Sequence, residues 1–264
     1  MIHSLLTRLV QGHRTIKYPQ GAPPPLSDRF RGRPLADVSR CPAGCRVCAE
    51  SCPVGAISRE GPLKVDLGAC LFCTDCARAC PEGAITFSKD FRLAARERSE
   101  LVVPMNEDGP LIPEAFEKRI RGLLSRSLRL RQVSAGGCNG CEPDINVLST
   151  IGWDWGRFGI QIVASPRHAD GLIVTGPVTA NMELALKKTY DAVPDPKIVI
   201  AVGSCPIAGG PWAGHPETRS GILGGVPVDL FIPGCPPHPL TILSGVLSVL
   251  GRLKTKSSAE KKSN

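Results

Sequence analysis

The sequence predicts two units of different architecture, a small α+β unit followed by a larger α/β unit built on a parallel sheet. The first observation is the placement of the 12 cysteines, of which eight lie within residues 41–80 and four lie beyond residue 137. The second is an internal repeat, because CPVGAI at 52–57 returns as CPEGAI at 80–85. The third is a series of short β-branched runs that alternate with helical segments, which is typical of a parallel sheet covered on both faces.

Composition and charge patterning exclude several classes. With 264 residues, 42% of them hydrophobic, the chain can bury a core, so disorder of the whole chain is excluded. The longest stretches without Asp, Glu, Lys or Arg, 198–216 and 230–251, are broken by Gly and Pro, so we expect no membrane-spanning helix. The N-terminal segment MIHSLLTRLVQGHR lacks the features of a secretory signal. Cysteines of a chain that is not exported are poor candidates for disulfides.

The first residues predict a short amphipathic helix. Its apolar side chains fall on one helical face beside Arg8 and Arg14, and they are Ile2, Leu5, Leu6, Leu9 and Val10. Such a stripe suits either a membrane surface or membrane subunit, or packing within a larger complex, and both interpretations stay open.

The cysteine spacing in the dense block is that of iron–sulfur ligands. The first copy reads C-x3-C-x2-C-x3-C-P and the second C-x2-C-x2-C-x3-C-P. In two-cluster ferredoxins such a run gives three thiolates to one 4Fe-4S cluster and the fourth to the other. The expected sets are therefore Cys41, Cys45, Cys48 and Cys80 for cluster 1, and Cys70, Cys73, Cys76 and Cys52 for cluster 2. A zinc ribbon is the alternative, but zinc sites need neither the repeated third spacing nor the Cys-Pro ending.

The larger unit is predicted from its apolar runs. Strands are expected at 128–133, 160–163, 172–174, 197–202 and 228–232. Helices are expected at 144–151, at 179–192 with Thr179 as N-cap, and at 239–253. We expect a first domain over 1–105, a linker with one helix (PEAFEKRIRGLL) over 106–127, a second domain over 128–253 and a disordered polar tail over 254–264.

The last four cysteines follow predicted strands of this unit. Cys138 and Cys141 come after the first strand, Cys205 after the fourth and Cys235 after the fifth, at the sheet edge where open α/β proteins build their sites. We expect them to hold cluster 3, a further 4Fe-4S cluster, although each cysteine taken alone suits an inert buried thiol. Three clusters of roughly −2 each would offset about six of the eight net positive charges, so no nucleic-acid partner is expected.

Several segments carry a family resemblance. After residue 127 they are GGCNGCE, RFGIQIVASPRHAD, TGPVT, PDPKIVIAVGSC and VDLFIPGCPPHP. Through them, residues 128–253 resemble the small cluster-bearing subunit shared by respiratory complex I and membrane-bound nickel–iron hydrogenases, which implies a flavodoxin-like fold. Residues 1–103 resemble the two-cluster, bacterial ferredoxin-like subunit of the same complexes, through YPQGAPPPLSDRFRGRP, the cysteine repeat and FRLAARERSELVV. Two subunits are thus expected to be fused in one chain.

One spacing favours a sub-family. In complex I the first two ligands of this cluster are adjacent, whereas here they are Cys138 and Cys141, as in hydrogenases of the formate-hydrogenlyase type. The resemblance implies an electron-transfer subunit, not catalytic alone, that passes electrons through three 4Fe-4S clusters to a large catalytic subunit. Membrane subunits would be further partners, with peripheral attachment at the cytoplasmic face of the inner membrane. Pro143 and the PIAGGPW segment after Cys205 depart from the usual pattern.

The alternatives are the same role in a complex I-like quinone oxidoreductase, a nickel-free relative, or a free-standing ferredoxin-like carrier. Glu142 resembles the glutamate used for proton passage in related hydrogenases. We expect it at the edge of cluster 3, facing the large subunit, with a pKa raised by low dielectric. Its other interpretation is a carboxylate stabilised by the helix dipole. His168 and His238 are expected to be hydrogen-bonding loop residues, because four thiolates complete each cluster.

Overall fold

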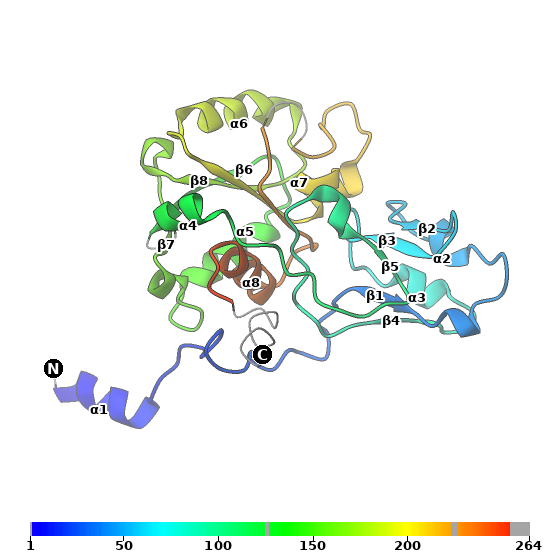
Figure 1. Ribbon diagram of the computed structural model, residues 1–264, viewed down its shortest axis with the longest axis horizontal. Helices are drawn as coiled ribbons and strands as arrows, with labels where there is room; N and C mark the ends of the chain where they lie inside the picture. The colour runs from blue at the N-terminus through cyan, green and yellow to red at the C-terminus, as the bar shows by residue number, and fades with distance from the viewer. Residues whose placement is uncertain (1, 125–126, 223–225, 254–264) are drawn as a thin grey trace, which may run out of the picture.

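The computed structural model describes residues 2–124, 127–222 and 226–253, arranged as a larger lobe, a smaller lobe and a projecting N-terminal helix (Figure 1). The mixed fold class expected from the sequence is confirmed, with a parallel sheet in the larger lobe and short antiparallel strands in the smaller one. The tail 254–264, expected to be disordered, lies outside the described residues.

The larger lobe is built on a five-stranded sheet in the order β10-β9-β8-β6-β7, with all neighbouring pairs parallel. Its strands are β6 (Leu128–Ser134), β7 (Ile160–Ile162), β8 (Gly171–Thr175), β9 (Ile198–Val202) and β10 (Leu230–Ile232). Successive side chains point to opposite faces, so Leu172 and Val174 enter one apolar cluster and Ile173 enters the other. All five expected strands are therefore present, and an apolar cluster lies on each face of the sheet.

Helices cover the two faces of this sheet. They are α5 (Cys141–Asn146), α6 (Ala180–Ala192), α7 (Ser204–Ala208) and α8 (Pro239–Val249), with α4 (Lys118–Leu124) at the side. Leu186 of α6 and Ile207 of α7 pack on one face, and α8, buried along its whole length, packs on the other. The α5 helix begins at Cys141, three residues before the expected start, and α8 ends before the expected residue 253.

The smaller lobe carries the repeat. Its strands are β1 (Pro34–Ala36), β2 (Ile57–Ser58), β3 (Lys64–Asp66), β4 (Ile85–Phe87) and β5 (Val102–Pro104), and its helices are α2 (Val47–Glu50) and α3 (Asp75–Ala79). β1 pairs with β4, and β3 pairs with both β2 and β5, always antiparallel. α2 and α3 occupy equivalent places in the two copies and lie against one another.

The lobes share one core. One apolar cluster contains Leu67 and Leu101 of the smaller lobe together with Leu172 and Ile207 of the larger. Backbone hydrogen bonds in both directions join Ala95 to Phe231, so the segment after β4 extends the edge of the parallel sheet at β10.

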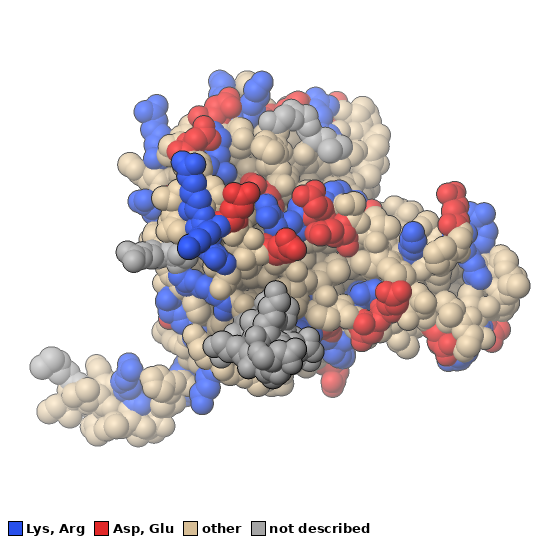
Figure 2. Space-filling model, viewed as in Figure 1, with Lys and Arg blue, Asp and Glu red and all other residues tan. Residues whose placement is uncertain are grey.

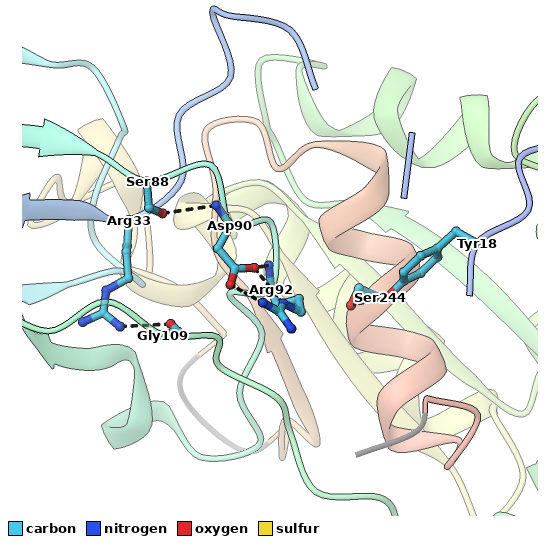
Figure 3. Close-up of polar contacts among 7 residues, drawn as sticks. All are labelled: Tyr18, Arg33, Ser88, Asp90, Arg92, Gly109 and Ser244. Carbon is cyan, nitrogen blue, oxygen red and sulfur yellow. Dashed lines mark hydrogen bonds and ion pairs between the residues drawn. The ribbon is translucent and has the colours of Figure 1, made fainter. Parts of the chain in front are cut away.

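Polar contacts fasten the N-terminal loop and the segment after β5 to this body (Figure 3). The Tyr18 hydroxyl donates to Ser244 Oγ of α8 (3.1 Å), and Arg92 donates two hydrogen bonds to Asp90. The buried Arg33 guanidinium donates to the carbonyl oxygens of Gly109 (3.2 Å) and Pro104 (2.7 Å). Gly109 of the expected linker is thus hydrogen-bonded to Arg33 of the smaller lobe.

The N-terminal helix α1 (Ile2–Gln11) stands away from both lobes (Figure 1). It has no buried residue, and its apolar stripe is exposed, from 52% at Leu6 to 85% at Val10. In Figure 2 its surface is mostly uncharged with basic groups beside it. Within the described ranges, no helix combines the length and apolar character needed to cross a bilayer.

Candidate iron–sulfur centres

The smaller lobe contains two cysteine-lined cavities. Cys41, Cys45, Cys48 and Cys80 line one of them, and Cys52, Cys70, Cys73 and Cys76 line the other. Each cavity receives three thiols from one copy and the last thiol from the other, which is the crossed arrangement expected from the sequence. Apolar side chains complete the walls, among them Leu63 in the first cavity and Phe87 in the second.

Backbone amides point at the sulfurs of these sites. The N–H of Ala56 donates to Cys52 Sγ (3.2 Å), and at the same place in the second copy Ala84 donates to Cys80 Sγ (3.4 Å). The N–H of Phe72 donates to Cys70 Sγ (3.3 Å). Such donors stabilise a thiolate, and hydrogen bonds to sulfur are one means by which a protein sets a cluster's potential.

Burial makes the thiolates dependent on a compensating positive charge. It raises the pKa of Cys70 to about 12, with neighbouring thiolates adding to the shift. Burial likewise raises the pKa of Cys205 in the larger lobe to about 11. At neutral pH these groups would be protonated unless metal ions bind them, because thiols lose their protons on coordination. The donor set and its surroundings therefore fit iron–sulfur clusters.

The other four cysteines gather at the carboxyl edge of the parallel sheet. Cys138 lies in the turn after β6, Cys141 begins α5, Cys205 lies in α7 and Cys235 follows β10. After burial and the Glu142 charge, Cys205, Cys235 and Cys138 also raise the pKa of Cys141, so the four thiols lie within electrostatic range of one another. Cys138 and Cys235 are exposed, which leaves this site open at the surface.

Glycines leave room beside these thiols. A Cβ built on Gly203 would lie 2.7 Å from Cys141 Sγ, and one on Gly210 would lie 2.7 Å from Cys205 Sγ. Both glycines have positive φ, of 102° and 56°. Side chains at either position would crowd the sulfurs that a cluster needs.

The described residues include no three Cys, His, Asp or Glu side chains placed to hold a single metal ion.

The three sites follow one another in space. Burial and nearby thiolates, Cys48 of the first site among them, raise the pKa of Cys76 in the second to about 11. Cys73 in turn contributes, after burial and Cys138, to raising the pKa of Cys235 in the third. The Ser204 hydroxyl in α7 donates to the Cys70 carbonyl oxygen (2.7 Å) and so joins the lobes between sites 2 and 3. The order is therefore site 1, site 2, site 3.

The pKa of Glu142 is shifted in the direction opposite to the one expected from the sequence. Its side chain is buried, and its Oε1 accepts hydrogen bonds from Ser134 Oγ (2.7 Å) and Thr175 Oγ1 (2.6 Å). Burial alone would raise its pKa, but the hydrogen bonds from Thr175, Ser134 and the Glu142 backbone N–H together outweigh burial and the pKa is lowered. The expected raised pKa is wrong, because the residues at the ends of β6 and β8 supply donors that the local sequence does not reveal.

The two histidines lie outside the cysteine sets. His238 caps α8, with Nδ1 accepting from the Leu240 N–H (3.1 Å), and its ring meets Phe30 and Trp153 edge-on. His168 is exposed in a 3₁₀ turn, Pro166–His168.

Sequence reasoning missed two residues of the candidate sites. Ser204 links sites 2 and 3, and Arg59 Nη1 lies 2.9 Å from Cys41 Sγ. The 28-residue repeat aligns Arg59 with Phe87. This replacement of an apolar residue by a charged one at equivalent positions could have indicated a special role for Arg59.

A ferredoxin-like lobe with two cysteine-lined cavities, joined to a parallel-sheet lobe with a third cysteine set, defines an iron–sulfur electron-transfer protein. Residues 138–249 match the family described as NADH ubiquinone oxidoreductase, 20 Kd subunit, and residues 63–86 match the 4Fe-4S binding domain. The chain is 46% identical over 141 residues to the probable membrane-bound hydrogenase subunit mbhJ of Pyrococcus furiosus, covering 52% of this chain and 84% of that one. The chain therefore belongs to the 20 kDa subunit family and carries an additional 4Fe-4S domain.

Other relatives span two kinds of complex. Formate hydrogenlyase subunit 7 of Escherichia coli is 38% identical over 168 residues, covering 61% of this chain and 66% of its own. The NADH-quinone oxidoreductase B-type subunit of Phocaeicola vulgatus is 40% identical over 115 residues, covering 43% and 58%. Among solved structures, a chain of the membrane-bound sulfane sulfur reductase, an archaeal respiratory membrane complex, aligns with a TM-score of 0.45 and 34% identity, covering 52% of this chain and 75% of that chain.

Proposed function

We propose that this chain is the iron–sulfur electron-transfer subunit of a membrane-bound nickel–iron hydrogenase-type complex, passing electrons through three 4Fe-4S clusters to a large catalytic subunit. The observation that carries the proposal is the succession of three four-cysteine sites through one shared core. The hydrogenase subunits among the relatives support this type of complex.

The proposed ligand sets are the three described above, and each bound cluster would supply a one-electron couple. The chain's own residues hold the thiolates, bury Cys48 and Cys76, and donate hydrogen bonds to sulfur. Because Cys138 and Cys235 are exposed, we propose that the large subunit covers site 3. The proposed domains are 1–105 and 128–253, with 106–127 as the connecting segment.

We propose that Glu142 takes part in proton passage beside site 3. The lowered pKa supports an ionised carboxylate that receives protons only transiently, held in place by Ser134 and Thr175. The carboxylate would therefore act as an acceptor, not as the poised acid that its sequence position predicted.

We also propose peripheral attachment at the cytoplasmic face of the membrane, through partner subunits, with α1 adding contact to the lipid surface. The membrane complexes named among the relatives support the association. The exposed apolar stripe of α1 supports the contact, and the first 27 residues hold Arg8, Arg14 and Lys17 but no acidic residue, which suits anionic lipid.

A complex I-like quinone oxidoreductase is the second candidate, favoured by the similarity to the NADH-quinone oxidoreductase relatives. The two candidates share the electron path but differ in the large subunit. Purifying the chain with its neighbours and assaying nickel separates them, since about one nickel per complex is expected for the hydrogenase type and none for the other.

The electron path itself is tested by reconstitution under anaerobic conditions. We expect about twelve irons and twelve sulfides per chain. Cys205→Ser should remove one paramagnetic signal and leave those of sites 1 and 2. Saturation near eight irons in the unaltered chain would rule out a cluster at site 3, and loss of every signal in the variant would contradict the separation of the sites.

A further inference from the structure

The two halves of the smaller lobe differ at one pair of equivalent positions. The repeat offset relates Arg59, just after β2, to Phe87 at the end of β4. Arg59 Nη1 donates to Cys41 Sγ at 2.9 Å. Phe87 lines the second cavity with Cys70, the first cysteine of the second copy, and its side chain has no hydrogen to donate. Cys41 therefore receives a charged side-chain donor, whereas Cys70 receives the backbone N–H of Phe72 and shares its cavity with a hydrocarbon ring.

The longer loop of the first copy makes room for this guanidinium. Three residues separate Cys41 from Cys45, whereas two separate Cys70 from Cys73. Arg59 also donates to the carbonyl oxygens of Cys45 and, at 3.4 Å, of Pro42, so it spans both sides of the longer loop. The extra loop residue and Arg59 thus occur together in the first copy, and the second copy has neither.

The hydrogen bond from Arg59 to Cys41 affects the reduction equilibrium of a cluster bound at site 1. Reduction adds one electron to a site that already holds four thiolates, with no bond broken and no proton taken up by the arginine. A guanidinium stays protonated at working pH, and its hydrogen bond to a ligand sulfur stabilises the more negative, reduced form. The side chain is only partly buried, so water screens its distant charge more than its direct sulfur contact.

We propose that Arg59 is a positioning residue that selectively raises the reduction potential of the cluster held by Cys41, Cys45, Cys48 and Cys80. This inference rests on the proposed function, since it requires a cluster at site 1. Site 1 is the end of the series farther from site 3. The arginine therefore makes the outer end of the path retain an electron more readily than it otherwise would.

The test is a redox titration of the full reconstituted chain, followed by electron paramagnetic resonance. The cluster 1 signal is identified as the one that Cys45→Ser removes. We expect Arg59→Gln to lower the ratio of reduced to oxidised cluster 1 about tenfold at a fixed potential, which equals about 59 mV for a one-electron couple. The signals of clusters 2 and 3 should titrate as before.

Arg40→Gln is the matched control. Arg40 belongs to the same lobe but donates to the carbonyl oxygens of Glu82 and Gly83, beside the ligand Cys80, and to no sulfur. It removes the same formal charge near the same site, so it should shift cluster 1 clearly less than Arg59→Gln does. Equal shifts in the two variants, or no shift in Arg59→Gln, would overturn the proposal.

Arg59→Lys covers the case in which Arg59→Gln fails to retain cluster 1. Lysine keeps the charge but lacks the planar fork, so a cluster with an intermediate potential is expected. If Arg59→Lys also loses the cluster, Arg59 only supports the loop and the proposal is wrong. If the unaltered chain holds no cluster at site 1, iron analysis shows that first, and the proposed function fails independently of Arg59.

Discussion

Several side chains at the three sites have contacts and charge states that their sequence neighbours do not predict. Glu142 follows the ligand Cys141, a position that predicted a poised acid, yet Ser134 and Thr175 turn it into a stabilised anion. Those two partners come from the ends of two strands, so only the assembled sheet brings them together. The cysteine sets themselves were predictable, because repeat and spacing are properties of the chain, whereas Arg59 and Ser204 act through tertiary contacts.

Glu142→Gln should slow turnover of the whole complex by about tenfold or more, while iron content and cluster signals stay unchanged, because glutamine cannot carry a proton. Turnover and spectra are measured on the same preparation. Thr175→Val is the control, because it removes one donor but keeps the carboxylate. Equal losses of turnover in both variants, or loss of the cluster 3 signal, would assign Glu142 a supporting role only.

Asp229, which precedes β10, should make the protein less stable as pH rises. Burial raises its pKa despite the hydrogen bond from the Val199 N–H (2.8 Å), so the folded state binds a proton more tightly than the unfolded state. Stability is therefore lost as pH rises from the ordinary pKa through the raised one, and the loss persists above it. Asp229→Asn should increase the denaturant midpoint more at pH 7 than at pH 4, and an equal effect at both would contradict this.

At the scale of elements, the strands were predicted well and the helix ends poorly. The central strands β8 and β9 are apolar, β-branched-rich runs buried on both faces, so their pattern is local. The helix expected from PEAFEKRIRGLL begins only at Lys118, after Phe116, whose N–H donates to the Val249 carbonyl oxygen at the end of α8. This contact joins the segment before α4 to a distant element, and no local pattern shows it.

The packing of α8 can be tested at Gly245. A Cβ there would lie 2.8 Å from the Ala94 Cβ, so Gly245→Val should destabilise the fold by about 1–3 kcal/mol through overpacking. Gly122 in α4 has open space around it, and Gly122→Ala should stabilise by about 0.5–1 kcal/mol because alanine favours helix. Denaturant unfolding measures both, and a stabilising Gly245→Val would contradict the close approach.

The α1 helix should bind vesicles that contain anionic lipid. Leu5→Asp with Leu9→Asp places charge on the apolar stripe and should reduce co-sedimentation of the purified chain about tenfold or more. Thr7→Asp with Gln11→Asp adds the same charge on the polar side and should reduce it much less. Equal reductions in the two variants would show that the contact is purely electrostatic. No binding by the unaltered chain would contradict the lipid contact and favour a protein partner for α1.

At the scale of the molecule, the two lobes form one body. The apolar cluster that holds Leu67 and Leu172 crosses between them, so the core on one face of the parallel sheet is shared by both lobes. The fusion of two units was predictable from the two cysteine patterns. Their common core was not, since Leu111 and Phe116, in a segment with the composition of a linker, are hydrogen-bonded to distant partners at Arg92 and Val249.

Because of this shared core, the lobes should unfold in a single transition. Leu67→Ala in the smaller lobe and Leu172→Ala in the larger one should each lower the free energy of unfolding by about 2–5 kcal/mol, in the same transition. Circular dichroism reports the sheet, and cluster absorbance reports the sites. Two separate transitions, each moved by one substitution only, would show that the lobes are independent.

The exposure of Cys138 and Cys235 has a consequence for the order of biogenesis. In the proposed assembly the large subunit closes this face to the machinery that delivers iron and sulfide, so a cluster at site 3 would have to be inserted before the subunits meet. Until then its open edge admits oxygen and chelators, to which sites 1 and 2 are less accessible behind their apolar walls. The unassembled chain would therefore be the form most easily damaged, and binding of the large subunit would both complete the electron path and protect the cluster at site 3.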